Sequence, residues 1–353
     1  MKLLPFKDVR IKLSLLSLMH FATDGLCAYL VFSKLYPENP KMSLSVFIAY
    51  NFLAFVTQSP IGMLIDKYNK PKLYLGISAS AIILGYAFSG ICLLSVVLIG
   101  LGNSLFHVAG GKYVSEKSGN DVAHLGIFVS TGAIGLAVGQ RYFSIFGVLH
   151  ILFAILGVCL MLLLVCEDPE DGRCDREYCS RGRVVDLALL AVIAVVFVRA
   201  FVGKVASADF EMTRHMPLVI AISTALGKAM GGITSRILGA VPTVVASMSV
   251  AAACLTLGCS DPYLYTLGVF AFNFSMPITL YHANILLKGR EGFAFGTLAA
   301  ILMPGYLIAT CFTYSVWIKI LTAVLCLASA VAVAVISRGI KSNDRSVDSY
   351  GSD

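Results

Sequence analysis

Long apolar runs, separated by short polar or charged segments, follow one another along almost the whole chain of 353 residues. A helix that crosses a membrane needs about 20 mostly apolar residues, whereas barrel strands would alternate apolar and polar positions, which these runs do not. The pattern therefore predicts an all-α integral membrane protein with twelve transmembrane helices. They are expected over residues 13–32, 43–65, 72–90, 94–114, 122–145, 147–166, 184–203, 213–235, 241–259, 263–284, 292–315 and 317–336.

One polar insertion, EDPEDGRCDREYCSRGR at residues 167–183, divides these helices into two sets of six. Adding 170 to each span of the first set gives the corresponding span of the second, and the shift also carries Asn103 onto Asn273. Matching halves of this kind predict two pseudo-symmetric six-helix bundles. The expected organisation is an N-terminal bundle at 1–166, a cytoplasmic linker loop at 167–183, a C-terminal bundle at 184–337 and a disordered cytoplasmic tail at 338–353.

Composition and charge agree with a membrane protein and give it an orientation. Hydrophobic residues make up 58% of the chain and charged residues only 13%, against about 25% charged in soluble domains. With the amino terminus inside, nineteen of the 27 Lys and Arg residues fall on the cytoplasmic side. This bias predicts a multi-pass protein of the plasma (inner) membrane with both termini in the cytoplasm. It also explains the net charge of +7 by anionic lipid, without nucleic acid.

The segment GMLIDKYNKPK, residues 62–72, joins the second and third expected helices. It resembles the cytoplasmic signature of the major facilitator superfamily, and the matching positions are Gly62, Leu64, Asp66, Lys67, Lys70 and Lys72. Asn69 stands where that signature has glycine, and asparagine tolerates a left-handed turn better than most residues. The resemblance implies the twelve-helix major facilitator fold and a cytoplasmic gate at this loop.

The loop also has a physical interpretation of its own. Asp66 lies at the carboxyl end of its helix, where its charge meets the negative end of the helix dipole, so it should seek a helix amino terminus or a cation. Arg236 occupies the corresponding place in the second half, so a lock there must be asymmetric. The alternative is that these charges only hold the loops inside. The expected gate residues are Gly62, Asp66, Lys67, Lys70, Lys72 and Arg236.

The first helix carries a titratable pair, His20 and Asp24, in the stretch SLMHFATDGLCAYLVF. A charge at the bilayer centre costs about 2.5–3.5 kcal/mol, so Asp24 should face a cavity or a partner. Residues four apart share a helix face, so the pair can share a proton, and we expect it to bind the coupling proton. Arg199 and Lys228, in the seventh and eighth helices, are expected on the opposite wall of the cavity as substrate-binding cations. The alternative is a static ion pair between the first and seventh helices.

Two shorter runs, MHFATDG and GLGNSLFHVAGG, resemble the fosmidomycin-resistance type of drug exporter, although Val108 stands where that type has proline. Asn103, His107 and Asn273 are candidates for hydrogen bonds to a substrate near the midplane. Hydrogen bonding between helices is the alternative for these side chains.

Together these features predict a secondary active transporter that works by alternating access, with proton-coupled export of a drug or metabolite. Uptake of a small organic anion through the C-half cations, by symport or facilitated diffusion, is the alternative; a non-transporting sensor or scaffold is less favoured. The chain has no H-E-x-x-H motif, no G-x-G-D acidic pair and no P-loop, so we expect neither an enzyme nor a primary pump. The expected partners are a small-molecule substrate, protons and lipid, with no metal or cofactor, and the protein is expected to be a monomer.

Overall fold

The computed structural model describes residues 8–142, 144–166, 183–206, 208–313 and 315–350, with the backbone alone at 183–185 and 341–350. The elements of the first half are α1 (Val9–Leu30), η1 (Val31–Leu35), α2 (Tyr36–Glu38), η2 (Pro40–Met42), α3 (Ser43–Asn51), η3 (Phe52–Val56), α4 (Gln58–Tyr68), α5 (Pro71–Ala87), α6 (Cys92–Lys117), α7 (Val122–Arg141) and α8 (Val148–Val165). Those of the second half are α9 (Arg183–Val205), α10 (Met216–Leu238), α11 (Ala240–Thr256), α12 (Pro262–Phe272), α13 (Ser275–Leu286), α14 (Glu291–Ala300), α15 (Leu302–Ala309) and α16 (Val316–Tyr350).

These elements join into the expected set of membrane spans. Within the described residues, ten helical segments are long and apolar enough to cross a membrane, and several of them run through more than one element, as in Val9–Glu38 and Pro262–Leu286. The helices α5 and α11, of 17 residues each, complete the set of twelve. The all-α transmembrane fold predicted from the apolar runs is therefore confirmed.

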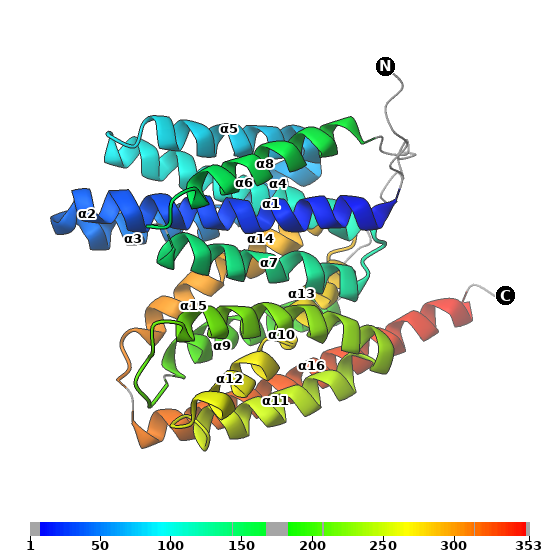
Figure 1. The fold of residues 1–353 in the computed structure, drawn as a ribbon. Coiled ribbons are helices and arrows are strands. Elements are labelled where there is room, and N and C mark those ends of the chain that lie inside the picture. The colour runs from blue at the N-terminus through cyan, green and yellow to red at the C-terminus, as the bar shows by residue number, and fades with distance from the viewer. Residues whose placement is uncertain (1–7, 143, 167–182, 207, 314, 351–353) are drawn as a thin grey trace.

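Figure 1 shows α1, α5, α6 and α8 of the first half on one side and α9, α11, α12 and α16 of the second half on the other, with α7 and α14 lying between these groups. The start of α1 and the end of α16 lie at the same end of the molecule, which we call the terminal end. The shift of 170 holds in the structure, since Cys92 opens α6 and Pro262 opens α12. Each half thus repeats the same succession of helices.

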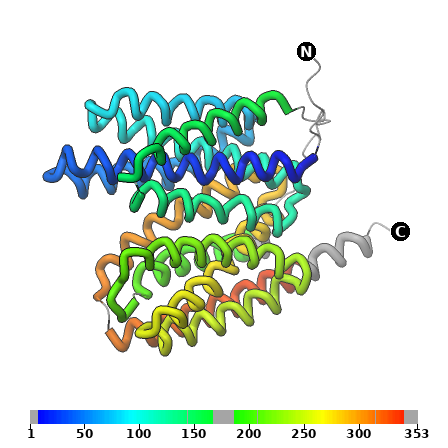
Figure 2. Tube along the Cα trace, viewed as in Figure 1, coloured from blue at the N-terminus to red at the C-terminus, as the bar shows by residue number. Residues whose placement is uncertain are grey.

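The halves meet along two pairs of helices: α4 packs against α14, and α7 packs against α10 (Figure 2). The second contact is tight because Gly126 has no side chain. A Cβ atom there would lie 2.7 Å from the carbonyl oxygen of Lys228. The small residue brings the backbone of α10, which carries Lys228, directly against α7.

Two spans of the second half are interrupted in the middle, and a proline explains each break. Pro277 and Pro304 lack the N–H that would bond to the carbonyl four residues earlier, and their rings clash there. Accordingly, α12 ends at Phe272 and α14 ends at Ala300.

The sequence also predicted a linker before the second half and a tail after it. The predicted linker lies almost wholly in residues 167–182, outside the described residues. The sequence predicts a tail from residue 338, but α16 continues to Tyr350. No proline occurs in this stretch, and a single Gly339 costs a helix only about 1 kcal/mol.

Candidate functional site

Three titratable side chains from two helices of the first half meet inside the protein. His20 and Asp24 lie on α1, one turn apart, and His107 lies on α6. The exposed fractions of these side chains are 5%, 18% and 13%, respectively. The expected pairing of His20 with Asp24 is present, with His20 Nε2 at 3.3 Å from Asp24 Oδ2.

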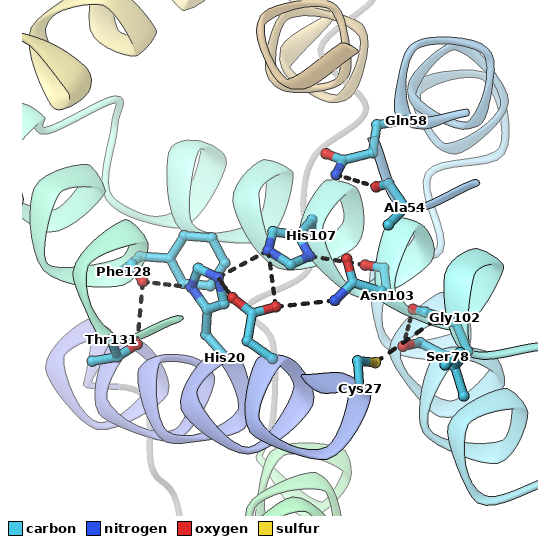
Figure 3. Close-up of polar contacts among 12 residues, drawn as sticks. His20, Cys27, Ala54, Gln58, Ser78, Gly102, Asn103, His107, Phe128 and Thr131 are labelled. Carbon is cyan, nitrogen blue, oxygen red and sulfur yellow. Dashed lines mark hydrogen bonds and ion pairs between the residues drawn. The ribbon is translucent and has the colours of Figure 1, made fainter. Parts of the chain in front are cut away.

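His107 joins this pair directly. Its Nε2 lies 2.9 Å from Nε2 of His20 and 3.5 Å from Asp24 Oδ1 (Figure 3). Asn103, one turn before His107, donates from Nδ2 to Asp24 Oδ1 at 3.0 Å. We refer to His20, Asp24, Asn103 and His107 as the proton cluster.

A hydrogen bond at the Nδ1 atom of each imidazole determines which ring nitrogen carries the proton. His20 Nδ1 lies 2.8 Å from the carbonyl oxygen of Phe128, and His107 Nδ1 lies 2.9 Å from the carbonyl oxygen of Asn103. A carbonyl only accepts, so both Nδ1 atoms must donate. In a neutral ring the Nε2 atom then carries a lone pair, and two lone pairs cannot face each other at hydrogen-bond distance. The geometry therefore requires one additional proton between the two rings, balanced by the Asp24 carboxylate.

The same donor atoms lie within 4.8 Å of one another, which is close enough for a metal ion. In a tetrahedral site with bonds of 2.0–2.1 Å, two ligand atoms are about 3.3 Å apart. The Nε2 atoms of His20 and His107 are only 2.9 Å apart, the length of a hydrogen bond. A shared proton fits this separation better than a metal does.

Packing by α7 holds the proton cluster in place. A Cβ atom at Gly132 would lie 2.3 Å from both Asp24 Oδ2 and His20 Nε2. Glycine is thus needed for α7 to cover the cluster. Cys27 and Tyr50 also lie within electrostatic range of Asp24.

The two cations expected on the opposite wall, Arg199 and Lys228, line one cavity in the second half. Its volume is about 320 Å³. Asn273 lines it as well, beside the break between α12 and α13, and it donates from Nδ2 to the carbonyl of Val269 at 2.8 Å. The sequence prediction placed Arg199, Lys228 and Asn273 at a substrate site, and the structure brings these three side chains to one cavity.

A charge that lines the cavity interacts with the charges of the proton cluster. Lys228 lies close enough to Asp24 and to His107 for their charges to interact. Among the residues that the structure describes, neither Arg199 nor Lys228 forms a direct ion pair with Asp24. A static ion pair between the first and seventh helices is therefore not seen in this conformation.

Asp66, the aspartate expected at the gate, contacts the other half as the dipole of its helix predicts. Its Oδ1 accepts from the backbone N–H of Gly292 at 2.9 Å, and its Oδ2 accepts from that of Phe293 at 2.7 Å. Both N–H groups lie in the first turn of α14, where the helix dipole is positive. Gly62 permits the close approach, since a Cβ atom there would lie 2.3 Å from the carbonyl oxygen of Gly292.

The cation that holds Asp66 is Lys112 of α6, which the sequence suggested only as a charge that orients the chain. Its fully buried Nζ lies 3.0 Å from Asp66 Oδ1, 2.6 Å from Glu116 Oε1 and 4.0 Å from Glu291 Oε2. Sequence spacing does not predict this ion pair, because Lys112 is far from Asp66 in the chain. The packing of α6 against α4 brings the two residues together.

Of the other expected gate residues, Arg236 contacts the opposite half, whereas Lys67 and Lys72 contact residues of their own half. Arg236 Nη1 is 3.1 Å from Oδ2 of Asp121, which caps α7, so the second contact between the halves is asymmetric as predicted. Lys72 donates to the carbonyl of Cys166 in its own half at 2.5 Å. Lys67 lies over the ring of Tyr68, 5.4 Å from its centroid, and Lys70 precedes α5. Asn69 adopts the predicted left-handed conformation, with φ 42°.

We compared this arrangement with known proteins. The sequence matches no protein-family model and no curated protein. The fold is similar to a crystal structure of the Escherichia coli fucose:proton symporter FucP, in an asparagine-to-alanine variant, with a TM-score of 0.64 and 15% identity over 94% of this chain and 98% of that one. A crystal structure of FucP, a major facilitator superfamily transporter, in the outward conformation gives a TM-score of 0.61 and 16% identity, over 93% and 97% of the two chains.

The chain therefore has the fold of the major facilitator superfamily transporters, as the resemblance of its 62–72 loop implied. The similarity covers nearly the whole length of both chains, so both six-helix halves take part in it. The narrower resemblance to fosmidomycin-resistance exporters stays a prediction.

Proposed function

We propose that this protein is a secondary active transporter that moves a small organic molecule by alternating access and couples the movement to protons. The observation that carries the proposal is the proton cluster, in which two imidazoles and a carboxylate meet and need one proton between the rings. Ionisable groups inside a membrane are costly, and in transporters they mark ion and proton pathways. A purely structural role would not require three ionisable side chains in contact with one another inside the membrane.

Loss of the shared proton changes the forces between helices. With the proton present, His20 of α1 and His107 of α6 are joined by a charged hydrogen bond, and Asp24 balances the charge. Without it, two lone pairs and a carboxylate face one another in a medium of low dielectric. The cluster can therefore favour different arrangements of α1 and α6 in its two protonation states, as alternating access requires.

The contacts of Asp66 and Arg236 support a second part of the proposal. They join the halves near the terminal end, through Asp66 with α14 and Arg236 with Asp121. If that end is cytoplasmic, as the Lys and Arg bias predicts, this conformation is closed toward the cytoplasm. Opening it requires breaking the Asp66 contacts, which gives this residue the role of a gate.

The direction of transport depends on how proton and substrate affect each other. Competition between them produces antiport, and hence the export predicted from the resemblance to drug exporters. Joint binding produces symport, which is the mode of transport of FucP, a fucose:proton symporter. Coupling to protons is common to both modes, and the proton cluster supports it in either case.

The test is substrate-driven pH change in proteoliposomes, using a compound first identified because it raises the thermal stability of the purified protein. We expect movement of the compound to change internal pH in the wild type. In Asp24→Asn the compound should still stabilise the protein, but the pH change should be lost. Unchanged coupling in Asp24→Asn would remove this residue from the proposed role, and binding without any flux would favour the sensor alternative.

A further inference from the structure

We infer that the substrate is a small organic anion, held by Arg199 and Lys228, and that it crosses the membrane together with the proton. This inference rests on the proposed function and adds the chemical class of the substrate. It favours the alternative given in the sequence analysis, uptake of a small organic anion by symport, over the predicted export. Three features carry it: the charges of the 320 Å³ cavity, the groups that orient them, and their electrostatic interaction with the proton cluster.

The first step is the unbalanced charge of the cavity. Arg199 and Lys228 both line it, and their positive charges are close enough to repel each other. No carboxylate among the described residues forms an ion pair with either of them. Both residues are half-buried. A cation partly withdrawn from water is stabilised by a paired anion, and two neighbouring cations need it more. An anionic ligand would supply the missing charge.

The second step is the orientation of Arg199. Its Nη1 donates to Thr279 Oγ1 at 3.2 Å, and that hydroxyl in turn donates to the carbonyl of Met276 at 2.9 Å. Thr279 therefore holds one edge of the guanidinium group while the remaining N–H donors are left for a ligand. A planar guanidinium matches a carboxylate or a similar oxyanion in a bidentate pair. The same contact shows that Arg199 points to the bundle interior rather than to lipid.

The third step is the rest of the cavity wall, which limits the body of the ligand. Most other lining side chains are apolar: Ile220, Leu255, Val269, Phe272, Met276 and Leu302. The hydroxyl of Tyr265 is already used, since it donates to the carbonyl of Ala206 at 3.0 Å. A cavity near the lower end of the range for small-molecule sites favours a compact ligand with one acidic head and an apolar remainder.

The fourth step is the sign of the coupling. Lys228 repels an added proton on the cluster, because its charge acts on both His107 and Asp24. The charged and titratable groups that face the cluster are Cys27, Tyr50, Lys228 and, beyond it, Arg199. An anion beside Lys228 and Arg199 offsets their repulsion and favours protonation. By linkage, the proton favours the anion equally, so the two bind together and move in the same direction.

Binding is tested first, with matched acids and amides on the purified full-length protein. The acids are benzoate, hexanoate and benzenesulfonate, and the neutral partners are benzamide, hexanamide and benzenesulfonamide. We expect at least one acid to raise the melting temperature while its amide does not. Arg199→Gln and Lys228→Gln should each weaken that acid about tenfold or more. Arg199→Lys keeps a charge and should retain part of the affinity.

Lys319→Gln is the matched control, because it removes a positive charge from the same half at a residue that pairs with Asp209, away from the cavity. It should leave acid binding unchanged. The inference is overturned if no acid stabilises the protein, if the amides do so equally well, or if acid binding survives in the double variant Arg199→Gln with Lys228→Gln.

The direction of coupling is tested with benzenesulfonate in proteoliposomes, because a sulfonate stays ionised and carries no proton of its own. Adding it outside should draw protons inward and make the external medium more alkaline, compared with protein-free liposomes. External acidification would show antiport and overturn the joint movement. Asp24→Asn should still bind the sulfonate but move no protons. Acid binding without proton movement in the wild type would contradict the proposed function and leave the anion site standing.

Discussion

His20 and His107 face each other through their Nε2 atoms at 2.9 Å, although they lie on different helices and 87 residues apart in the chain. Each ring is held from behind by a backbone carbonyl that accepts from its Nδ1 atom. The pair is therefore built to hold one proton between two rings. This relationship gives the most direct spectroscopic prediction.

Histidine-labelled protein should show this shared proton by nuclear magnetic resonance. We expect strongly downfield Nε2–H intensity shared between His20 and His107, because their Nε2 atoms are 2.9 Å apart. Asp24→Asn should weaken this signal, because it removes the carboxylate that balances the charge of the shared proton. His150→Gln removes a histidine outside the cluster and should leave the signal unchanged. Two independent neutral rings with no shared signal would contradict the assignment.

Gly132→Ala should abolish proton-coupled transport. The added Cβ would lie 2.3 Å from His20 Nε2 and from Asp24 Oδ2, so the cluster or α7 must move. Gly157→Ala, on α8, is the control, since nothing lies within 4 Å of its added Cβ. Both variants should insert and fold, as judged by size-exclusion elution. Wild-type coupling in Gly132→Ala would show that the cluster does not depend on this packing.

Asp66→Ala should open the terminal end of the protein. It removes two charge-assisted hydrogen bonds to α14, each worth about 1.5–3 kcal/mol, and leaves Lys112 with fewer partners. We expect faster thiol labelling of a cysteine introduced between the halves, on the cytoplasmic side. Lys288→Ala is the control, because Lys288 is exposed and is not one of the expected gate residues. Equal labelling of both variants would argue against the gate role.

Lys112→Met should be far more damaging than Arg236→Gln. Lys112 is fully buried among Asp66, Glu116 and Glu291, so its loss leaves buried carboxylates without a cation and costs about 3–5 kcal/mol. The Arg236 side chain is 61% exposed in its contact with Asp121, and such a pair is worth about 0–1 kcal/mol. Thermal unfolding of the two variants in detergent measures the difference. Similar melting temperatures would contradict this ranking.

The sequence predicted the features that depend on one helix alone or on the order of the helices along the chain. Apolar runs predicted the spans, and the four-residue spacing of His20 and Asp24 predicted their shared face. The dipole of α4 predicted what Asp66 would seek, and the structure supplies both a helix amino terminus and a cation. These predictions succeeded because helix geometry relates near neighbours in a fixed way.

Contacts between helices could not be predicted in the same way. Nothing in its local sequence places His107 against His20, because that contact depends on how α6 crosses α1. The sequence suggested His107 as a substrate ligand, which stays a prediction, and the structure places its Nε2 atom 2.9 Å from that of His20. Lys112 is similar: one lysine near a helix end looks like any topology charge until packing buries it beside Asp66.

The Asp66 contact has a consequence for mutational scans of α14. The groups that donate to Asp66 are main-chain N–H groups, which every residue except proline retains. Replacing the phenyl ring of Phe293, which packs against the hydrophobic core, would change that packing but leave the N–H at that position intact. Phe293→Pro is the substitution at this position that removes the donor. A screen that changes side chains but keeps the backbone N–H groups therefore does not test the hydrogen bond from Phe293 to Asp66.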